Sequence, residues 1–269
     1  MKKALKIETG LRVNLYPLGD THVGSLAADE KRNQDLAAII AADPVGRVVG
    51  LGDFVEAVAP SDKRWSGREL PDYADAEMLE NLFYRQAMRF CKLYEATTGK
   101  WDVLIRGNHE QTAISRFFAD PCAIIAERMK TKYIGDHEAS GWLVYLLKDD
   151  AGKTRAMVRV FIAHGWAGGE LKGGTALALQ RALLRKDTDL VMLAHSHQAI
   201  AFPETVERVA QSGEIKTATR WGLVTFPMIE KHGYIARRGG NASPAGYSIV
   251  HLEAGTDNSL SISVEQRAI

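Results

Sequence analysis

Leu104-Ile105-Arg106-Gly107-Asn108-His109-Glu110 is the stretch around which this chain of 269 residues is organised. It begins as a short apolar run with the character of a buried β-strand, and it stops abruptly at a glycine. An amide, an imidazole and a carboxylate then follow side by side. Because α/β proteins place their sites where buried strands give way to loops, this junction is predicted to carry chemistry.

Four other apolar runs end in the same manner. They are residues 15–18 before Asp20 and His22, residues 48–51 before Asp53, residues 160–163 before His164, and residues 190–194 before His195 and His197. Carboxylate, imidazole and amide donors together suit Mn, Fe, Zn or Co better than Ca. With Asn108 they make seven side chains, too many for one ion and about right for two adjacent ions. The sequence therefore predicts a two-metal site assembled from most of the chain.

Each of these residues also has a structural explanation when it is taken alone. An Asp after Gly is commonly a turn residue or a helix cap, and a lone buried His is commonly a hydrogen-bonded core residue. The ordered repetition of the pattern favours metal binding over these explanations. A structural zinc site closed by sulfur is not expected, because Cys91 and Cys122 lie in unrelated contexts.

The composition is that of an ordinary soluble globular protein, with 46% hydrophobic and 25% charged residues. A net charge of +1 gives no overall field that would attract nucleic acid or an anionic membrane, so such a partner would need a local patch. The basic start lacks the apolar run of a signal peptide, and no run has the length of a membrane span. The two cysteines fit a reducing cytosol, and a cytoplasmic location is predicted.

The order of predicted elements indicates an α/β fold with parallel strands. A strand over residues 11–18, a helix between Asp29 and Asp43 and a strand over residues 47–51 form a β-α-β unit. A short helical turn is predicted from Thr112, and a further helix begins at Asp120-Pro121, with Asp as the cap. Residues 141–148 and 154–163 are predicted to form a β-hairpin, followed by a helix over residues 175–186 and a strand over residues 189–194.

One domain is predicted over residues 1–269, with a helical insertion at about residues 56–99. The insertion is expected to cover one side of the site, and within it residues 73–98 are expected to form one long helix. The segment Lys63-Arg64-Trp65 mixes cations with an aromatic ring. A plain surface loop explains it, and the alternative that we hypothesise is a contact with the substrate. In the tail, residues 220–229, 247–252 and 260–264 are predicted strands at the edge of a second sheet.

Five motifs resemble the signature of the calcineurin-like metallophosphoesterase family. They are Gly-Asp-Thr-His (19–22), Gly-Asp-Phe-Val-Glu (52–56), Gly-Asn-His-Glu (107–110), a His before Gly (164–165) and His-Ser-His (195–197). The resemblance implies a four-layer αββα sandwich of two mixed β-sheets flanked by helices, with a dinuclear metal site at the carboxyl ends of strands. The compact length is similar to that of small phage and bacterial members.

The resemblance also assigns roles to the candidate residues. It implies that Asp20, His22 and His197 hold one metal, that Asn108, His164 and His195 hold the other, and that Asp53 bridges both. His109 would be the catalytic residue, facing the phosphate and the leaving group. Two divalent ions are implied, with Mn²⁺ expected and Fe, Zn, Co or Ni as alternatives.

The implied reaction is hydrolysis of a phosphoester by a metal-bridging hydroxide. The Ser/Thr phosphatase branch of the family carries Asp-Arg-Gly after its second motif, whereas Glu56-Ala57-Val58 follows here without an Arg. This departure favours a phosphodiesterase, with nucleic acid among the candidate substrates. Glu110 is a milder departure, because nuclease-type members generally show Gly-Asn-His-Asp. The alternatives are a phosphomonoesterase similar to protein phosphatases and a catalytically silent binding scaffold.

Overall fold

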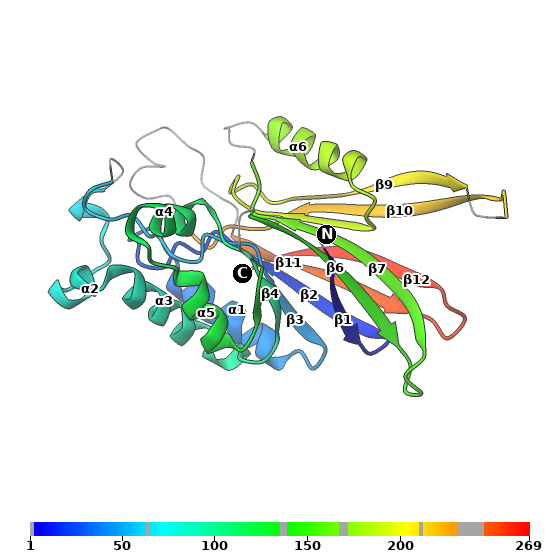
Figure 1. The fold of residues 1–269 in the computed structure, drawn as a ribbon, viewed down its shortest axis with the longest axis horizontal. Coiled ribbons are helices and arrows are strands. Elements are labelled where there is room, and N and C mark those ends of the chain that lie inside the picture. The colour runs from blue at the N-terminus through cyan, green and yellow to red at the C-terminus, as the bar shows by residue number, and fades with distance from the viewer. Residues whose placement is uncertain (1–2, 63–64, 135–138, 167–171, 210–211, 231–244) are drawn as a thin grey trace.

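Two mixed β-sheets lie face to face in this protein, and helices cover their outer faces (Figure 1). The computed structural model describes residues 3–62, 65–134, 139–166, 172–209, 212–230 and 245–269. The layers therefore run helix, sheet, sheet and helix, which confirms the fold class predicted from the sequence.

The first sheet contains the strands that precede three of the predicted junctions. Its order is β12-β11-β2-β3-β4-β5. The strands are β2 (Arg12–Leu18), β3 (Gly46–Gly50), β4 (Trp101–Leu104), β5 (Lys132–Tyr133), β11 (Gly246–Ala254) and β12 (Leu260–Ala268). Strands β2 to β5 are parallel, whereas β11 pairs antiparallel with both β2 and β12.

The second sheet contains the strands that precede the other two junctions, and its order is β1-β6-β7-β8-β10-β9. The strands are β1 (Leu5–Thr9), β6 (Ser140–Lys148), β7 (Thr154–Ala163), β8 (Leu190–Leu193), β9 (Ile200–Val209) and β10 (Ile215–Val224). The predicted hairpin is confirmed as β6 and β7, which pair antiparallel, and β7 pairs in parallel with β8. Parallel β2, β3 and β4 end at one edge of their sheet, and parallel β7 and β8 end at one edge of theirs.

The helices lie outside the two sheets. They are α1 (Glu30–Ala42), α2 (Ala76–Glu80), α3 (Leu82–Leu93), α4 (Asn108–Phe117), α5 (Pro121–Met129) and α6 (Lys172–Arg185), with 3₁₀ turns η1 (Gly67–Glu69) and η2 (Glu95–Thr97). The caps of α1 and α5 are the predicted ones, since Asp29 accepts from the Arg32 N–H and Asp120 from the Ala123 N–H.

Alternation along the strands divides the core into layers. In β2, Leu15 packs with Val160 and Met192 of the other sheet, whereas the neighbouring Tyr16 packs against the helices with Ile40. On the far side, α6 packs Leu179 and Leu183 against Phe161 and Val191 of the second sheet. Since β4 and β8 are buried along their whole length, only the ends of these strands are open to a site.

Several predicted boundaries were wrong. The single helix expected over residues 73–98 is two helices and a 3₁₀ turn, because the Asn81 backbone leaves the helical region between α2 and α3. The helix expected from Thr112 begins at Asn108. The strand expected over residues 220–229 is β10, which ends at Val224 and belongs to the second sheet. Strands β1, β5 and β9 were not predicted.

Within the described ranges, no helix is both long and apolar enough to cross a membrane.

Candidate metal centre

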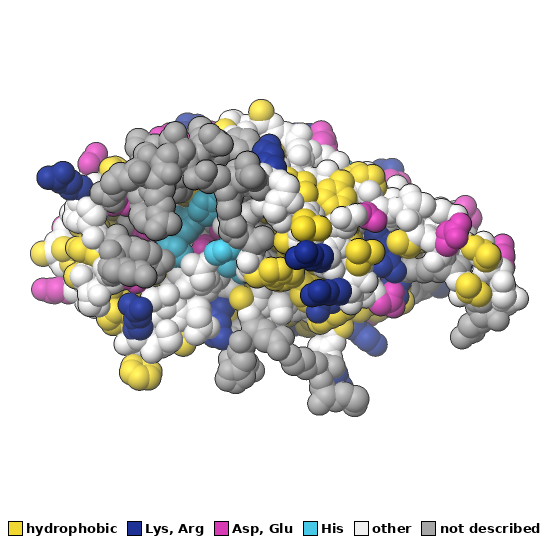
Figure 2. All heavy atoms as spheres, turned by 90° about the horizontal axis from the view of Figure 1, so that it is seen from above, with side chains coloured by type: hydrophobic (Ala, Val, Ile, Leu, Met, Phe, Trp, Pro, Cys, Tyr) yellow, Lys and Arg dark blue, Asp and Glu magenta, His cyan; other side chains and the backbone are white. Residues whose placement is uncertain are grey.

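The candidate residues meet where the strands of both sheets end. The loops after β2 and β3 run side by side, because the Asp20 N–H donates to the Gly52 carbonyl at 3.0 Å and the Thr21 N–H to the Asp53 carbonyl at 2.9 Å. A parallel bridge between Val23 and Val55 extends this pairing. Histidine side chains consequently reach the surface close together, with acidic side chains beside them (Figure 2).

The first group contains Asp20, His22 and His197, whose candidate ligand atoms all lie within 4.8 Å of one another. The Nε2 atoms of His22 and His197 are 3.3 Å apart, and His197 Nε2 is 3.5 Å from Asp20 Oδ1. Asp20 is fully buried, and His197 is a quarter exposed. These are the three residues that the family resemblance assigns to one metal.

The second group contains Asp53, His164 and His195, again with ligand atoms within 4.8 Å of one another. His164 Nε2 lies 3.1 Å from Asp53 Oδ2 and 3.3 Å from His195 Nδ1. Asn108 joins this group, because its Oδ1 is 3.1 Å from His164 Nε2. The structure thus brings the second predicted set together.

Asp53 lies between the two groups. Its Oδ2 atom is 3.1 Å from His164 Nε2 of the second group and 3.9 Å from His22 Nε2 of the first. Only 2% of the Asp53 surface is exposed, so solvent does not screen these contacts. One oxygen shared in this way is the arrangement that a bridging ligand requires.

The residues present fit a pair of divalent cations. Asp20 Oδ1 is buried and has no hydrogen-bond partner among the described residues, an expensive state for a carboxylate oxygen. Two pairs of imidazole nitrogens approach to 3.3 Å, where both nitrogens cannot be protonated without repulsion. Bound cations would satisfy the orphan oxygen and both nitrogen pairs at once, using the N and O donors that borderline metals prefer.

Two of the histidines are oriented by acceptors on their other ring nitrogen. His22 Nδ1 lies 3.0 Å from Glu56 Oε2, and His164 Nδ1 lies 2.8 Å from the Leu51 carbonyl oxygen. An acceptor at Nδ1 holds the proton there and directs the Nε2 lone pair into the site, as is usual for metal-binding histidine.

The backbone of the site is strained. Five of the eight candidate residues have positive φ: Asp20 (52°), His22 (44°), Asp53 (53°), His195 (72°) and His197 (55°). This left-handed region is sparsely populated by residues other than glycine, and for histidine it costs energy. Such strain persists only where surrounding contacts fix it, and it is typical of functional sites.

The charges of the two groups support one another. Burial opposes the ionisation of Asp53, but the facing His164 and His109 hold its pKa well below the usual range. Burial likewise disfavours a charged His164, yet the Asp53 carboxylate raises the pKa of that imidazole to about 10. For His195, burial and the neighbouring His164 lower the pKa. In the metal-free protein, the ionised Asp53 carboxylate is thus balanced by the charged His164 imidazole beside it.

His109, at the start of α4, forms a further group with His22 and Asp53, whose candidate ligand atoms lie within 4.8 Å of one another. Its backbone N–H donates to Asp53 Oδ1 at 2.9 Å, and its ring Nδ1 contacts the Glu56 carbonyl oxygen. The ring stands edge-on to His22 with centroids 4.6 Å apart, and 12% of its side chain is exposed. His109 is thus held at the open side of the site.

Two acidic residues were missed as contributors. Glu56 is the partner of His22, and Glu110 accepts hydrogen bonds from the backbone N–H groups of Asp53 and Val55. Both lie inside the quoted motifs, Gly-Asp-Phe-Val-Glu and Gly-Asn-His-Glu. Glu110 lies three residues after the N-cap Gly107, which is the spacing of the acidic residue in a helix capping box. This spacing could have identified Glu110 as a residue that bonds back to the backbone.

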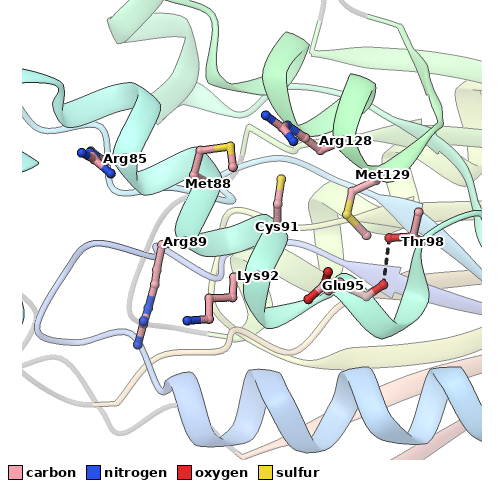
Figure 3. Close-up of a pocket in the computed structure, with 9 residues that line it drawn as sticks. All are labelled: Arg85, Met88, Arg89, Cys91, Lys92, Glu95, Thr98, Arg128 and Met129. Carbon is pink, nitrogen blue, oxygen red and sulfur yellow. Dashed lines mark hydrogen bonds between the residues drawn. The ribbon is translucent and has the colours of Figure 1, made fainter.

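The predicted contact of Lys63-Arg64-Trp65 with substrate stays a prediction. Lys63 and Arg64 lie outside the described residues, and Trp65 borders a small hollow together with Glu56. A groove of about 660 Å³ lies elsewhere, between α3 and α5, and none of the eight candidate residues lines it (Figure 3). Two cations of that groove are paired, Arg89 with Glu30 and Arg85 with Glu77.

No protein-family model and no curated protein matches this chain. Solved structures with a similar fold include that of a conserved uncharacterized protein from Streptococcus pneumoniae, which is described as a predicted phosphoesterase. It is 10% identical with a TM-score of 0.40, over 97% of this chain and 91% of that one. Vps29 of Chaetomium thermophilum is 9% identical with a TM-score of 0.39, over 96% and 97%.

The NAD nucleotidase of Haemophilus influenzae is 11% identical with a TM-score of 0.42. The match covers 95% of this chain but 49% of the nucleotidase, so this chain spans about half of that protein. At this level of similarity, the chemistry has to be read from the side chains of the site.

Proposed function

We propose that this protein is a metal-dependent hydrolase of phosphoric esters with a preference for phosphodiesters. The observation that carries the proposal is the position of Asp53 Oδ2 between His22 Nε2 and His164 Nε2, one from each group of candidate ligands. A buried carboxylate shared by two imidazole-rich groups is the feature that two-metal hydrolases need. The motif resemblance to metallophosphoesterases favours the same reading.

The proposed ligands of the cations are the residues whose side chains lie together in the two groups. Asp20, His22, His197 and Asp53 would hold one ion, and Asp53, Asn108, His164 and His195 the other. When bound, two divalent cations polarise phosphoryl oxygens and activate water near neutral pH. Glu56 and the Leu51 carbonyl fix His22 and His164 in the tautomer that such binding requires.

His109 is proposed to act on the leaving group. The Glu56 carbonyl at its Nδ1 fixes the ring, so that a proton on the other nitrogen would be presented at the open side of the site. Donation of a proton to a departing alkoxide is a task suited to an imidazole.

The charge around His109 supports a diester as the substrate. The Glu56 carboxylate lies 3.8 Å from His109 Nδ1 and 3.0 Å from His22 Nδ1, so it adds negative charge beside the site. A phosphomonoester dianion is repelled there more than a diester monoanion. No arginine lies between residues 54 and 59 to offset this repulsion.

Turnover of bis-(p-nitrophenyl) phosphate and of p-nitrophenyl phosphate, each with and without added Mn²⁺, tests the proposal. We expect hydrolysis that depends on metal, is abolished by a chelator and has the higher kcat/KM for the diester. A higher kcat/KM for the monoester would identify a phosphomonoesterase. Two bound ions without turnover of either compound or of single-stranded DNA would instead identify a silent scaffold.

A further inference from the structure

Glu110 has a fully buried carboxylate that is surrounded by backbone donors. Its Oε2 accepts from the Gly107 N–H at 2.8 Å and from the Asp53 N–H at 2.9 Å. Its Oε1 accepts from the Val55 N–H at 3.1 Å. The side chain has no exposed surface, so the three bonds are formed in a medium where an unpaired carboxylate would be very costly.

Helix capping explains only one of these bonds. Glu110 is the third residue of α4, and its bond to Gly107 is the usual return of such a residue to the helix N-cap. The bonds to Asp53 and Val55 span 57 and 55 positions in the chain, and they reach the loop after β3. A cap alone would not need them, so the carboxylate joins two separate junctions of the site.

The two junctions touch without side chains between them. A Cβ atom at Gly52 would lie 2.3 Å from the Gly107 nitrogen, and one at Gly107 would lie 2.0 Å from Asp53 Oδ1. Glycine at both positions lets the backbones approach, and the Glu110 carboxylate then bonds to both. The loop after β3 carries Asp53, and the loop after β4 leads directly into Asn108 and His109 at the start of α4.

We infer that Glu110 is a positioning residue that sets the spacing between Asp53 and Asn108 and thereby makes the second metal position competent. This inference rests on the proposed function. Two of the four proposed holders at the second position, Asp53 and Asn108, belong to the joined loops, whereas only Asp53 does so at the first position. Loss of the Glu110 hydrogen bonds between the two loops should therefore lower the affinity for the second ion more than the affinity for the first.

Glu110→Gln tests the inference by the binding of Mn²⁺. An amide can keep one acceptor oxygen, but its NH₂ group then opposes one of the three backbone N–H donors. We expect wild-type protein to take up two ions in titration calorimetry and the variant to take up one ion with nearly unchanged affinity. The affinity for the second ion should fall roughly 10–100-fold, the range for residues that orient metal ligands.

Two further variants complete the design. Tyr94→Phe removes a buried hydrogen bond of 2.7 Å to Asn33, so it lowers the melting temperature without touching the joined loops, and both ions should bind as in wild type. Glu110→Asp keeps the charge but shortens the reach, and it serves if the Gln variant does not fold. We expect it to show the same order of loss, the second ion before the first.

The outcomes separate the inference from the proposed function. If wild-type protein takes up no pair of ions, the proposed two-metal function fails. If wild-type protein binds two ions and the Glu110 variants bind both with unchanged affinity, the positioning role is overturned. Equal weakening of both ions would also overturn it, because the role predicts a difference between the positions.

Discussion

Asp53 combines a shared carboxylate with a left-handed backbone, at φ 53°. Asn is tolerated in that conformation about as well as Asp, so Asp53→Asn changes the charge without adding backbone strain. We expect turnover and metal content to fall together. Metal affinity should drop by more than the roughly 10–100-fold loss that is typical when a residue that only orients a metal ligand is replaced. Elemental analysis beside kinetics measures both. Two tightly held ions with normal turnover would remove Asp53 from the shared position.

His109→Ala separates metal binding from chemistry. The loss of a proton donor typically lowers the rate on the order of 10²–10⁴-fold, and a poor leaving group suffers more than a good one. We expect the variant to lose more activity on DNA or an alkyl diester than on a nitrophenyl diester, while two ions remain bound. An equal loss on both substrates would mean that His109 stabilises charge on the phosphoryl group. Loss of the metals would make it a ligand.

His164 links metal binding to pH. Asp53 outweighs burial and raises the pKa of His164 to about 10, so at neutral pH the metal-free protein holds an imidazolium there. That charge contributes stability that is fully present below the ordinary pKa of 6.5 and is lost as the pH rises through about 10.

A cation can bind His164 only after the proton leaves. We therefore expect protons to be released when metal is added near pH 7.5, and metal affinity to increase with pH. Titrations in two buffers that differ in ionisation enthalpy should give different apparent enthalpies. Identical enthalpies in both buffers would show that His164 is already neutral in the metal-free protein.

The strands that carry the site were predictable because the sequence marks the residue where each strand ends. Residues 48–51 and 190–194 are short apolar runs stopped by Gly-Asp or His, and a strand buried on both faces needs no further signal. Strand β9 gave no such signal, since Pro203 and the charged Glu204 and Glu207 interrupt its apolar pattern, as is typical of an edge strand that depends on its partner β10.

The start of α4 was predicted less well than the starts of α1 and α5, because it depends on distant contacts. The spacing of Gly107 and Glu110 is a local signal for this helix start, but the Glu110 carboxylate that accepts from the Gly107 N–H also accepts from the Asp53 N–H, 57 positions away in the chain. Glu56 was quoted as part of a motif, but its contact with His22 spans 34 positions in the chain and required the fold.

The contact between the loops after β3 and β4 predicts the effect of Gly52→Ala. Gly52 and Gly99 both have positive φ, 90° and 83°, so alanine is strained at either position by about 1–2 kcal/mol. Only at Gly52 would the new Cβ meet backbone, at 2.3 Å from the Gly107 nitrogen, whereas nothing lies within 4 Å at Gly99. We expect Gly52→Ala to unfold at a clearly lower denaturant concentration than Gly99→Ala and to lose metal binding. Equal effects would show that the two loops can move apart freely.

At the scale of the whole molecule, the two groups of ligands join both sheets, so metal should stabilise the entire fold. Ions at 100 times their dissociation constant add about 2.7 kcal/mol for each independent site. For a chain of this size, that corresponds to a rise in melting temperature of roughly 5–10 °C for each ion bound. Thermal unfolding with Mn²⁺ and with a chelator measures the difference, and Asp53→Asn serves as the control. An unchanged melting temperature would contradict a metal site shared between the sheets.

Strand β2 lies between β3 and β11, so its two neighbours come from opposite ends of the described chain. A ribosome that adds about 5–20 residues per second needs roughly 10–50 s to pass from residue 18 to residue 246. Throughout that interval one side of β2 offers unpaired backbone groups beside apolar side chains, which is a template for aggregation. The exposed edge of β2 in the nascent chain must therefore be shielded, by a chaperone or by later segments of the same chain, until β11 is synthesised.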